Sequence, residues 1–127
     1  MNNTINVPIS IGELFDKYTI LQIKSEKLKN DATKIESIHK ELNYLQKHID
    51  NICVSKKLLE NLKKVNEELW DIEDKIREKE KLNVFDDEFI LLARSVYKTN
   101  DLRSRIKYDI NRETNSDIIE IKSYYAY

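Results

Sequence analysis

Apolar residues recur at helical spacing along most of the chain and predict four helices. The clearest rows lie in the middle of the chain, where the spacing alternates strictly between three and four residues. The first row contains Ile35, Ile38, Leu42, Leu45, Ile49 and Ile52, and the second contains Leu58, Leu62, Val65, Leu69, Ile72 and Ile76. This alternation is typical of a coiled-coil seam. Because the link between the two rows is short, we expect them to form a long antiparallel hairpin.

Capping residues mark where the predicted helices begin. Ser10 is followed three residues later by Glu13, which is a capping-box pattern. Ser55 precedes the third apolar row, and either Asp86 or Asp87 caps the fourth. These signals and the apolar rows predict an all-α fold, an antiparallel bundle of about four helices with a coiled-coil-like hairpin. Short extended segments are expected at both ends. We predict one domain, residues 1–127, with helices over residues 10–29, 33–52, 55–81 and 86–113.

Composition supports long, uninterrupted helices. The 127 residues include only 1 Gly and 1 Pro, so few positions favour tight turns, and 35% of the residues are charged. The net charge of -1 gives no overall attraction to nucleic acid or to an anionic membrane. No apolar run approaches the roughly 20 residues that a membrane-spanning helix needs.

Two further features predict a cytoplasmic protein. The first ten residues lack the basic and apolar regions of a signal peptide. Cys53 is the only cysteine, so the chain cannot form an internal disulfide, and a reducing compartment is expected.

Polar residues form a second row beside the apolar row on each of the last two predicted helices. On the fourth helix, Asn100 and Arg103 also interrupt the apolar row itself. If the two helices are antiparallel neighbours, their acids and arginines face one another across a groove, to which Glu13 and Asp16 could contribute. Arginines in such a groove would bind an anionic or sugar-like ligand with paired hydrogen bonds. The candidate ligand-binding residues are Glu73, Arg77, Arg94, Tyr97, Asn100, Asp101 and Arg103.

The same residues have a second interpretation, as an interhelical ladder of salt bridges with Trp70 as a packing residue at its edge. Such ladders are common on charged helices and contribute little to stability. The sequence alone does not separate a ligand site from a ladder.

Metal, cofactor and nucleic-acid sites are not predicted. Glu36 and His39 form a single Glu-x-x-His element, whereas a di-iron bundle needs two such elements and two further glutamates. Glu67, Glu68 and Asp71 resemble the Mg²⁺-binding acids of helical pyrophosphohydrolases, but their order is reversed. There is no glycine-rich phosphate loop. The basic residues from 98 to 112 are interleaved with acids, which disfavours a nucleic-acid surface.

Four long motifs carry a family resemblance. They are SIGELFDKYTILQIK from Ser10, LWDIEDKIR from Leu69, LARSVYKTND from Leu92 and EIKSYYAY from Glu120. In these motifs the chain resembles a family of small uncharacterised proteins from bacteria and their phages, classed as a domain of unknown function. The resemblance implies a helical domain without an established activity.

Two hypotheses about function follow. The first is a non-catalytic helical interaction or assembly module, which binds a second copy of the chain or a partner helix. The second is a binding protein or enzyme for a sugar nucleotide or another phosphorylated ligand, with its pocket between the third and fourth helices.

Overall fold

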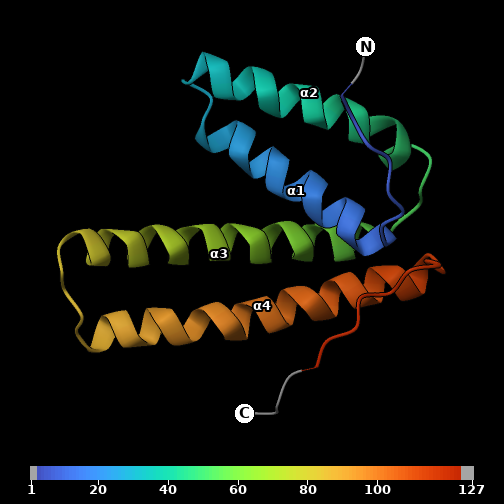
Figure 1. The fold of residues 1–127 in the computed structure, drawn as a ribbon. Helices are drawn as coiled ribbons and strands as arrows, with labels where there is room; N and C mark the ends of the chain where they lie inside the picture. Colours follow the sequence, from blue (N-terminus) through green and yellow to red (C-terminus); the bar gives the residue numbers. More distant parts are fainter. Residues whose placement is uncertain (1–2, 124–127) are drawn as a thin grey trace.

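Four helices make up most of the computed structural model, which describes residues 3–123 (Figure 1). They are α1 (Ile11–Lys27), α2 (Ala32–Ile49), α3 (Lys56–Lys81) and α4 (Asp87–Glu113). The described residues contain no β-strand, and extended segments flank the helices, so the predicted all-α bundle is confirmed. Residues 124–127, the end of the EIKSYYAY motif, lie outside the described part. No helix in residues 3–123 is both long and apolar enough to cross a membrane.

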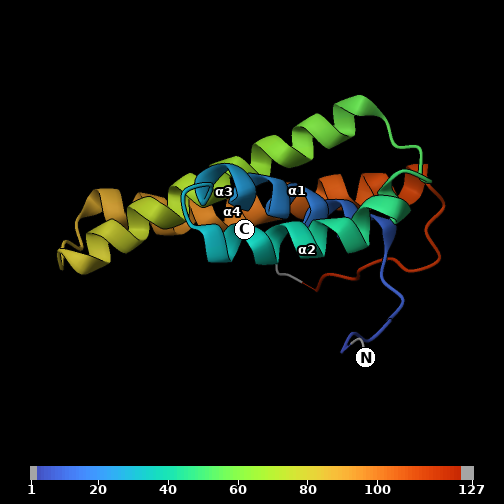
Figure 2. The same ribbon diagram turned by 90° about the horizontal axis from the view of Figure 1, so that it is seen from above.

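The helices form two hairpins, α1 with α2 and α3 with α4 (Figures 1 and 2). The predicted hairpin of the second and third helices is therefore wrong: among the described helices, α2 packs against α1 alone, while α1 also packs on α3 and α4. The physical reason is that a heptad seam defines which face of a helix is apolar but not which helix covers it. The link at residues 52–55 has no regular secondary structure and is not a tight turn, so α3 leaves in a different direction.

Each helix begins at a residue whose side chain accepts a hydrogen bond from the first turn. Ser10, Asp31, Ser55 and Asp86 accept from the backbone N–H of the residue three positions later. Such caps satisfy amides that have no partner inside the helix. The caps predicted at Ser10 and Ser55 are confirmed, and of the two candidates for the fourth helix, Asp86 and Asp87, it is Asp86 that caps α4.

The core lies where α1 crosses the α3–α4 hairpin. Its buried residues come from three helices and are Phe15, Leu62, Val65, Ile106 and Ile110. Half-buried side chains from the end of α2 and from the link after it, including Ile49 and Val54, complete the cluster. The core is therefore confined to one end of the hairpin.

The other end of the α3–α4 hairpin extends beyond α1 and α2 in both views (Figures 1 and 2). We call residues 67–102 the arm, because no residue in this range is buried. The arm comprises the second half of α3, the connection at residues 82–86 and the first half of α4. Its base meets α1 near Asp71, whose carboxylate lies 4.0 Å from the amine of Lys27.

Candidate functional site

The first turn of α1 is anchored on α4 and the segment after it. The N–H of Ile11 donates to the hydroxyl of Ser116 (3.0 Å), and the N–H of Gly12 donates to the side-chain oxygen of Asn111 (2.6 Å). A Cβ at Gly12 would lie 2.5 Å from the backbone oxygen of Lys107, so only glycine allows this approach. The single glycine of the chain thus stands where two helix backbones meet.

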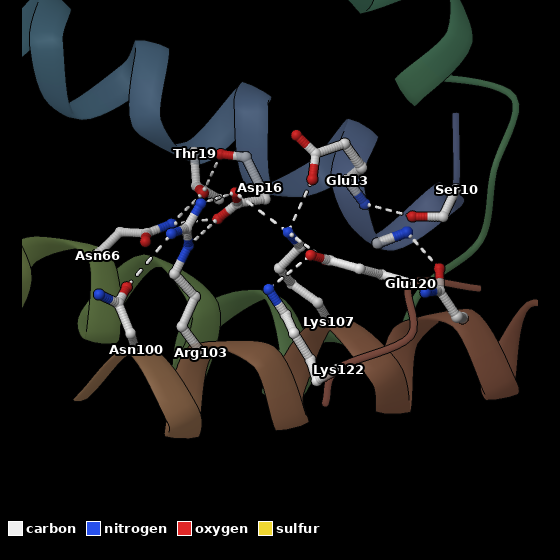
Figure 3. A network of polar contacts seen from close by, with 12 residues as sticks. Ser10, Glu13, Asp16, Thr19, Asn66, Asn100, Arg103, Lys107, Glu120 and Lys122 are labelled. Carbon is white, nitrogen blue, oxygen red and sulfur yellow. Dashed lines mark hydrogen bonds and ion pairs between the residues drawn. The ribbon is translucent and has the colours of Figure 1, made fainter. Parts of the chain in front are cut away.

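This approach buries a carboxylate, that of Asp16, which is 1% exposed. The guanidinium of Arg103 donates to both of its oxygens, and the Nε–Oδ1 distance is 2.9 Å (Figure 3). The amide of Asn66 on α3 donates to Asp16 (3.0 Å) and to the hydroxyl of Thr19 (2.9 Å). Paired, hydrogen-bonded charges of this kind are the form in which buried charges are tolerated. The Asp16 hydrogen bonds raise the pKa of the Arg103 guanidinium, while burial lowers it.

A second cation, Lys107, lies one turn further along α4. Its amine is 2.7 Å from Glu13, 3.2 Å from Glu120 and 3.8 Å from Asp16. Glu120 belongs to the extended segment that follows α4, and it also binds Lys122 at 2.6 Å. The hydrogen bond from Lys122 has the largest effect and lowers the pKa of the Glu120 carboxyl; burial opposes it, and the hydrogen bond from Lys107 lowers the pKa further. Lys107 therefore ties α1 and the C-terminal segment to α4.

We call these groups the crossing cluster (Figure 3). Its charges balance, with three acids and three bases: Glu13, Asp16, Glu120, Arg103, Lys107 and Lys122. In the described part of the chain, every buried side-chain nitrogen or oxygen has a hydrogen-bond partner. Residues 3–123 also contain no group of three or more His, Cys, Asp or Glu that could hold a metal ion. The charged groups of the cluster are thus paired with one another, and their arrangement suits a structural role that holds α1 and the C-terminal segment on α4.

The predicted ligand-binding residues are not all brought together. Arg103 belongs to the crossing cluster, and the side-chain oxygen of Asn100 lies 3.4 Å from its Nη1. Glu73 and Arg77 form an exposed pair on α3, with a nitrogen–oxygen distance of 3.8 Å. The remaining three residues lie on the part of α4 that belongs to the arm, two of them exposed and one half-buried: Arg94, Tyr97 and Asp101.

Sequence reasoning identified part of the cluster and missed the rest. Glu13 and Asp16 were expected to approach the fourth helix, and they do. Asn111, Ser116 and Glu120 were missed because their roles depend on where the chain turns after α4. One signal was available: Asn100, Arg103, Lys107 and Asn111 follow one another at spacings of three and four residues, which is a continuous polar row at core-facing positions.

The arm presents the opposite surface, with large apolar side chains in contact with solvent. Among them Leu91 is 63% exposed, Phe85 55% and Ile90 52%. The tip is nevertheless ordered by polar contacts: Asp86 caps α4 and lies 2.9 Å from the amine of Lys79, which also binds Glu88 at 3.1 Å. Lys79 lowers the pKa of the Asp86 carboxyl through this hydrogen bond. The arm is thus an ordered helical hairpin that leaves large apolar side chains exposed.

Comparison with known proteins gives a family and no activity. The model of a family of unknown function, DUF6165, matches residues 5–127, which is nearly the whole chain. No curated protein and no solved structure shows a significant match. The resemblance to an uncharacterised family, expected from the four motifs, is confirmed.

Proposed function

We propose that this chain, which belongs to the family of unknown function DUF6165, is a non-catalytic helical module that assembles through its arm. The observation that carries the proposal is the uncovered apolar surface of the arm. Residues 67–102 contain no buried side chain, yet Leu82, Phe85, Ile90, Leu91 and Leu102 are all more than 40% exposed. Exposed apolar side chains of this kind are candidates for an interaction site, because covering them is favourable by about 25 cal/mol per Å².

The crossing cluster supports the same role from the other end of the hairpin. It holds the base of α3 and α4 against α1 through paired charges, so the arm is presented in a defined direction. A surface that is rigid before binding loses less conformational freedom when it binds. In this proposal the partner is a second copy of the chain or a helix of another protein, and the cytoplasm is its compartment.

Sedimentation velocity across a wide range of protein concentration tests the proposal. We expect the sedimentation coefficient to rise with concentration, and Leu91→Asp to keep the protein monomeric because it places a charge on the apolar face. Val7→Asp is the matched control, since Val7 is 64% exposed, like Leu91, but lies outside the arm. A wild-type monomer at every concentration, or equal effects of the two substitutions, would contradict the proposal.

The alternative function, binding of a sugar nucleotide or another phosphorylated ligand between α3 and α4, stays a prediction. Arg103 is already held by Asp16, so such a ligand would depend mainly on Arg77 and Arg94. A thermal-shift series with nucleotides, sugar nucleotides and phosphosugars tests it. A saturable rise in melting temperature that Arg94→Gln abolishes would favour the ligand site over the assembly module.

A further inference from the structure

The outer face of α4 carries a second heptad row, distinct from the row that faces the core. It runs Ile90, Arg94, Tyr97, Asp101, Ser104 and Tyr108, with spacings of four and three residues. The core-facing row of the same helix contains Arg103, Ile106 and Ile110, which lie on the opposite side. A helix with two heptad rows can pack against two neighbours at once.

Large side chains with apolar surface lie on this outer row or beside it, and they are exposed. On the row, Ile90, Tyr97 and Tyr108 are 52%, 42% and 43% exposed, and Leu91, next to Ile90, is 63% exposed. The other side of α4 packs against α3 and α1. These side chains would drive an association, while the charges on the row would decide its orientation.

The charges on the outer rows of two copies complement one another if the two helices run antiparallel. Arg94 and Asp101 carry opposite charges, and they lie seven residues apart on one face, or about 10 Å along the helix. In a parallel pairing of two such rows, each residue would meet its own copy, so arginine would face arginine and aspartate would face aspartate. In an antiparallel pairing, each arginine can face an aspartate.

We propose that the outer face of α4 pairs with the same face of a second copy of this chain, antiparallel about a twofold axis midway between Arg94 and Asp101. Arg94 of each copy then faces Asp101 of the other, and two identical ion pairs form about the axis. A twofold interface is self-complementary and closed, so it gives a dimer and not a fibre.

This inference rests on the proposed function and adds the partner, the face and the register to it. Exposed ion pairs stabilise only weakly, so the apolar side chains on and beside the row supply the affinity, and Arg94 and Asp101 select the alignment. Reversing one of these charges puts two like charges together at both ends of the interface. Interfacial charge pairs in close contact couple strongly enough that each reversal should weaken association roughly tenfold or more.

Native mass spectrometry of charge-reversed chains, each checked for helix content by circular dichroism, tests the register. We expect Arg94→Asp and Asp101→Arg to weaken the homodimer when each is present alone. An equimolar mixture of the two variants should form the heterodimer, because every Asp at position 94 then meets an Arg at position 101. The double variant R94D/D101R should recover the homodimer for the same reason.

The other outcomes separate this inference from the proposed function. If the single variants dimerise like the wild type, or if the mixture and the double variant fail to recover association, the proposed register is wrong. The proposed function then still stands, provided that Leu91→Asp abolishes the assembly. If the wild type is a monomer at every concentration, both are wrong.

Discussion

The two ends of the α3–α4 hairpin use the same residue pattern in different surroundings. At the base, Leu62 and Val65 of the α3 seam are buried together with Ile106 and Ile110 of α4. In the arm, the next residues of that seam, starting at Leu69, are only half-buried. The difference arises because α1 crosses the base and does not reach along the arm. Two paired helices therefore make a seam, but a third neighbour is needed to make a core.

The polar residues differ between the two ends in the same way. At the base they are buried and paired across three helices, as in the contact of Asp16 with Arg103 and Asn66. In the arm the pairs join residues that are near one another in sequence, and some are fully exposed, such as Glu73 with Arg77 within α3. The base is thus built for stability, and the arm leaves its surface available to a partner.

Breaking the Asp16 contact should have the largest effect. Asp16→Ala removes the carboxylate that accepts from the half-buried Arg103 guanidinium and from the Asn66 amide. Removing one member of a buried ion pair costs about 3–5 kcal/mol. Urea unfolding measures this loss of stability. Asp71→Ala is the control at the arm, where the exposed pair with Lys27 should contribute about 1 kcal/mol or less. Similar losses for both variants would contradict the distinction between base and arm.

Substitution of two leucines in the same α3 seam compares the apolar packing of the base with that of the arm. Leu62 has no exposed surface, so Leu62→Ala should cost about 2–5 kcal/mol through lost burial and the cavity left behind. Leu69 lies two turns later and is half-buried, so Leu69→Ala should cost clearly less in the monomer. Equal changes in the free energy of unfolding, measured at low protein concentration, would show that the arm has a core of its own.

Gly12→Ala should destabilise the base although alanine favours helices. In an open helix this change gains about 1 kcal/mol. Here the new Cβ would meet the backbone oxygen of Lys107 at 2.5 Å, so α1 must shift, and we expect a net loss of about 1–3 kcal/mol. Thermal unfolding measures the sign, with Ser37→Ala on the exposed face of α2 as the control. A stabilised Gly12→Ala variant would contradict the close approach of α1 and α4.

The smallest effect concerns pH and the C-terminal segment. Because Lys122 and Lys107 lower the pKa of Glu120 in the folded state, its carboxylate stabilises the fold above the ordinary pKa near 4.5. That contribution is lost as the pH falls through the lowered pKa. Glu120 is more than one-third exposed, so the effect should be well under 1 kcal/mol. Glu120→Gln should therefore flatten the acid side of the stability profile slightly, and Glu36→Gln should not.

Local features of this fold were predictable from the sequence, and the pairing of its helices was not. Ser10, Ser55 and Asp86 mark helix starts because a cap depends on neighbours three residues away. The partner of the second helix was mispredicted because its seam could pack equally well on α1 or α3. That choice depends on the irregular link at residues 52–55 and on the attachment of Ser55 to Glu113, where the N–H of Ser55 donates at 2.8 Å.

The candidate site shows the same limit. Asn100 and Arg103 stood out because polar residues at core-facing positions need partners. Their pattern did not reveal whether those partners were a ligand or other parts of the chain. For Arg103 the partner is another part of the chain, the buried Asp16 of α1, which is 87 positions away in the sequence. Arg94 and Asp101 carry the same kinds of charge, but they remain at the surface because they lie on the side of α4 opposite to the core-facing row.

Hydrogen–deuterium exchange of the wild-type chain at several protein concentrations tests the central claim most directly. At low concentration, we expect the amides of residues 72–99 to exchange much faster than those near Leu62 and Ile110, because the arm has no buried side chain. As the concentration rises, exchange in the arm should slow selectively, above all on α4 around Arg94 and Asp101. Arm exchange that is independent of concentration would contradict the claim that the arm is an assembly surface.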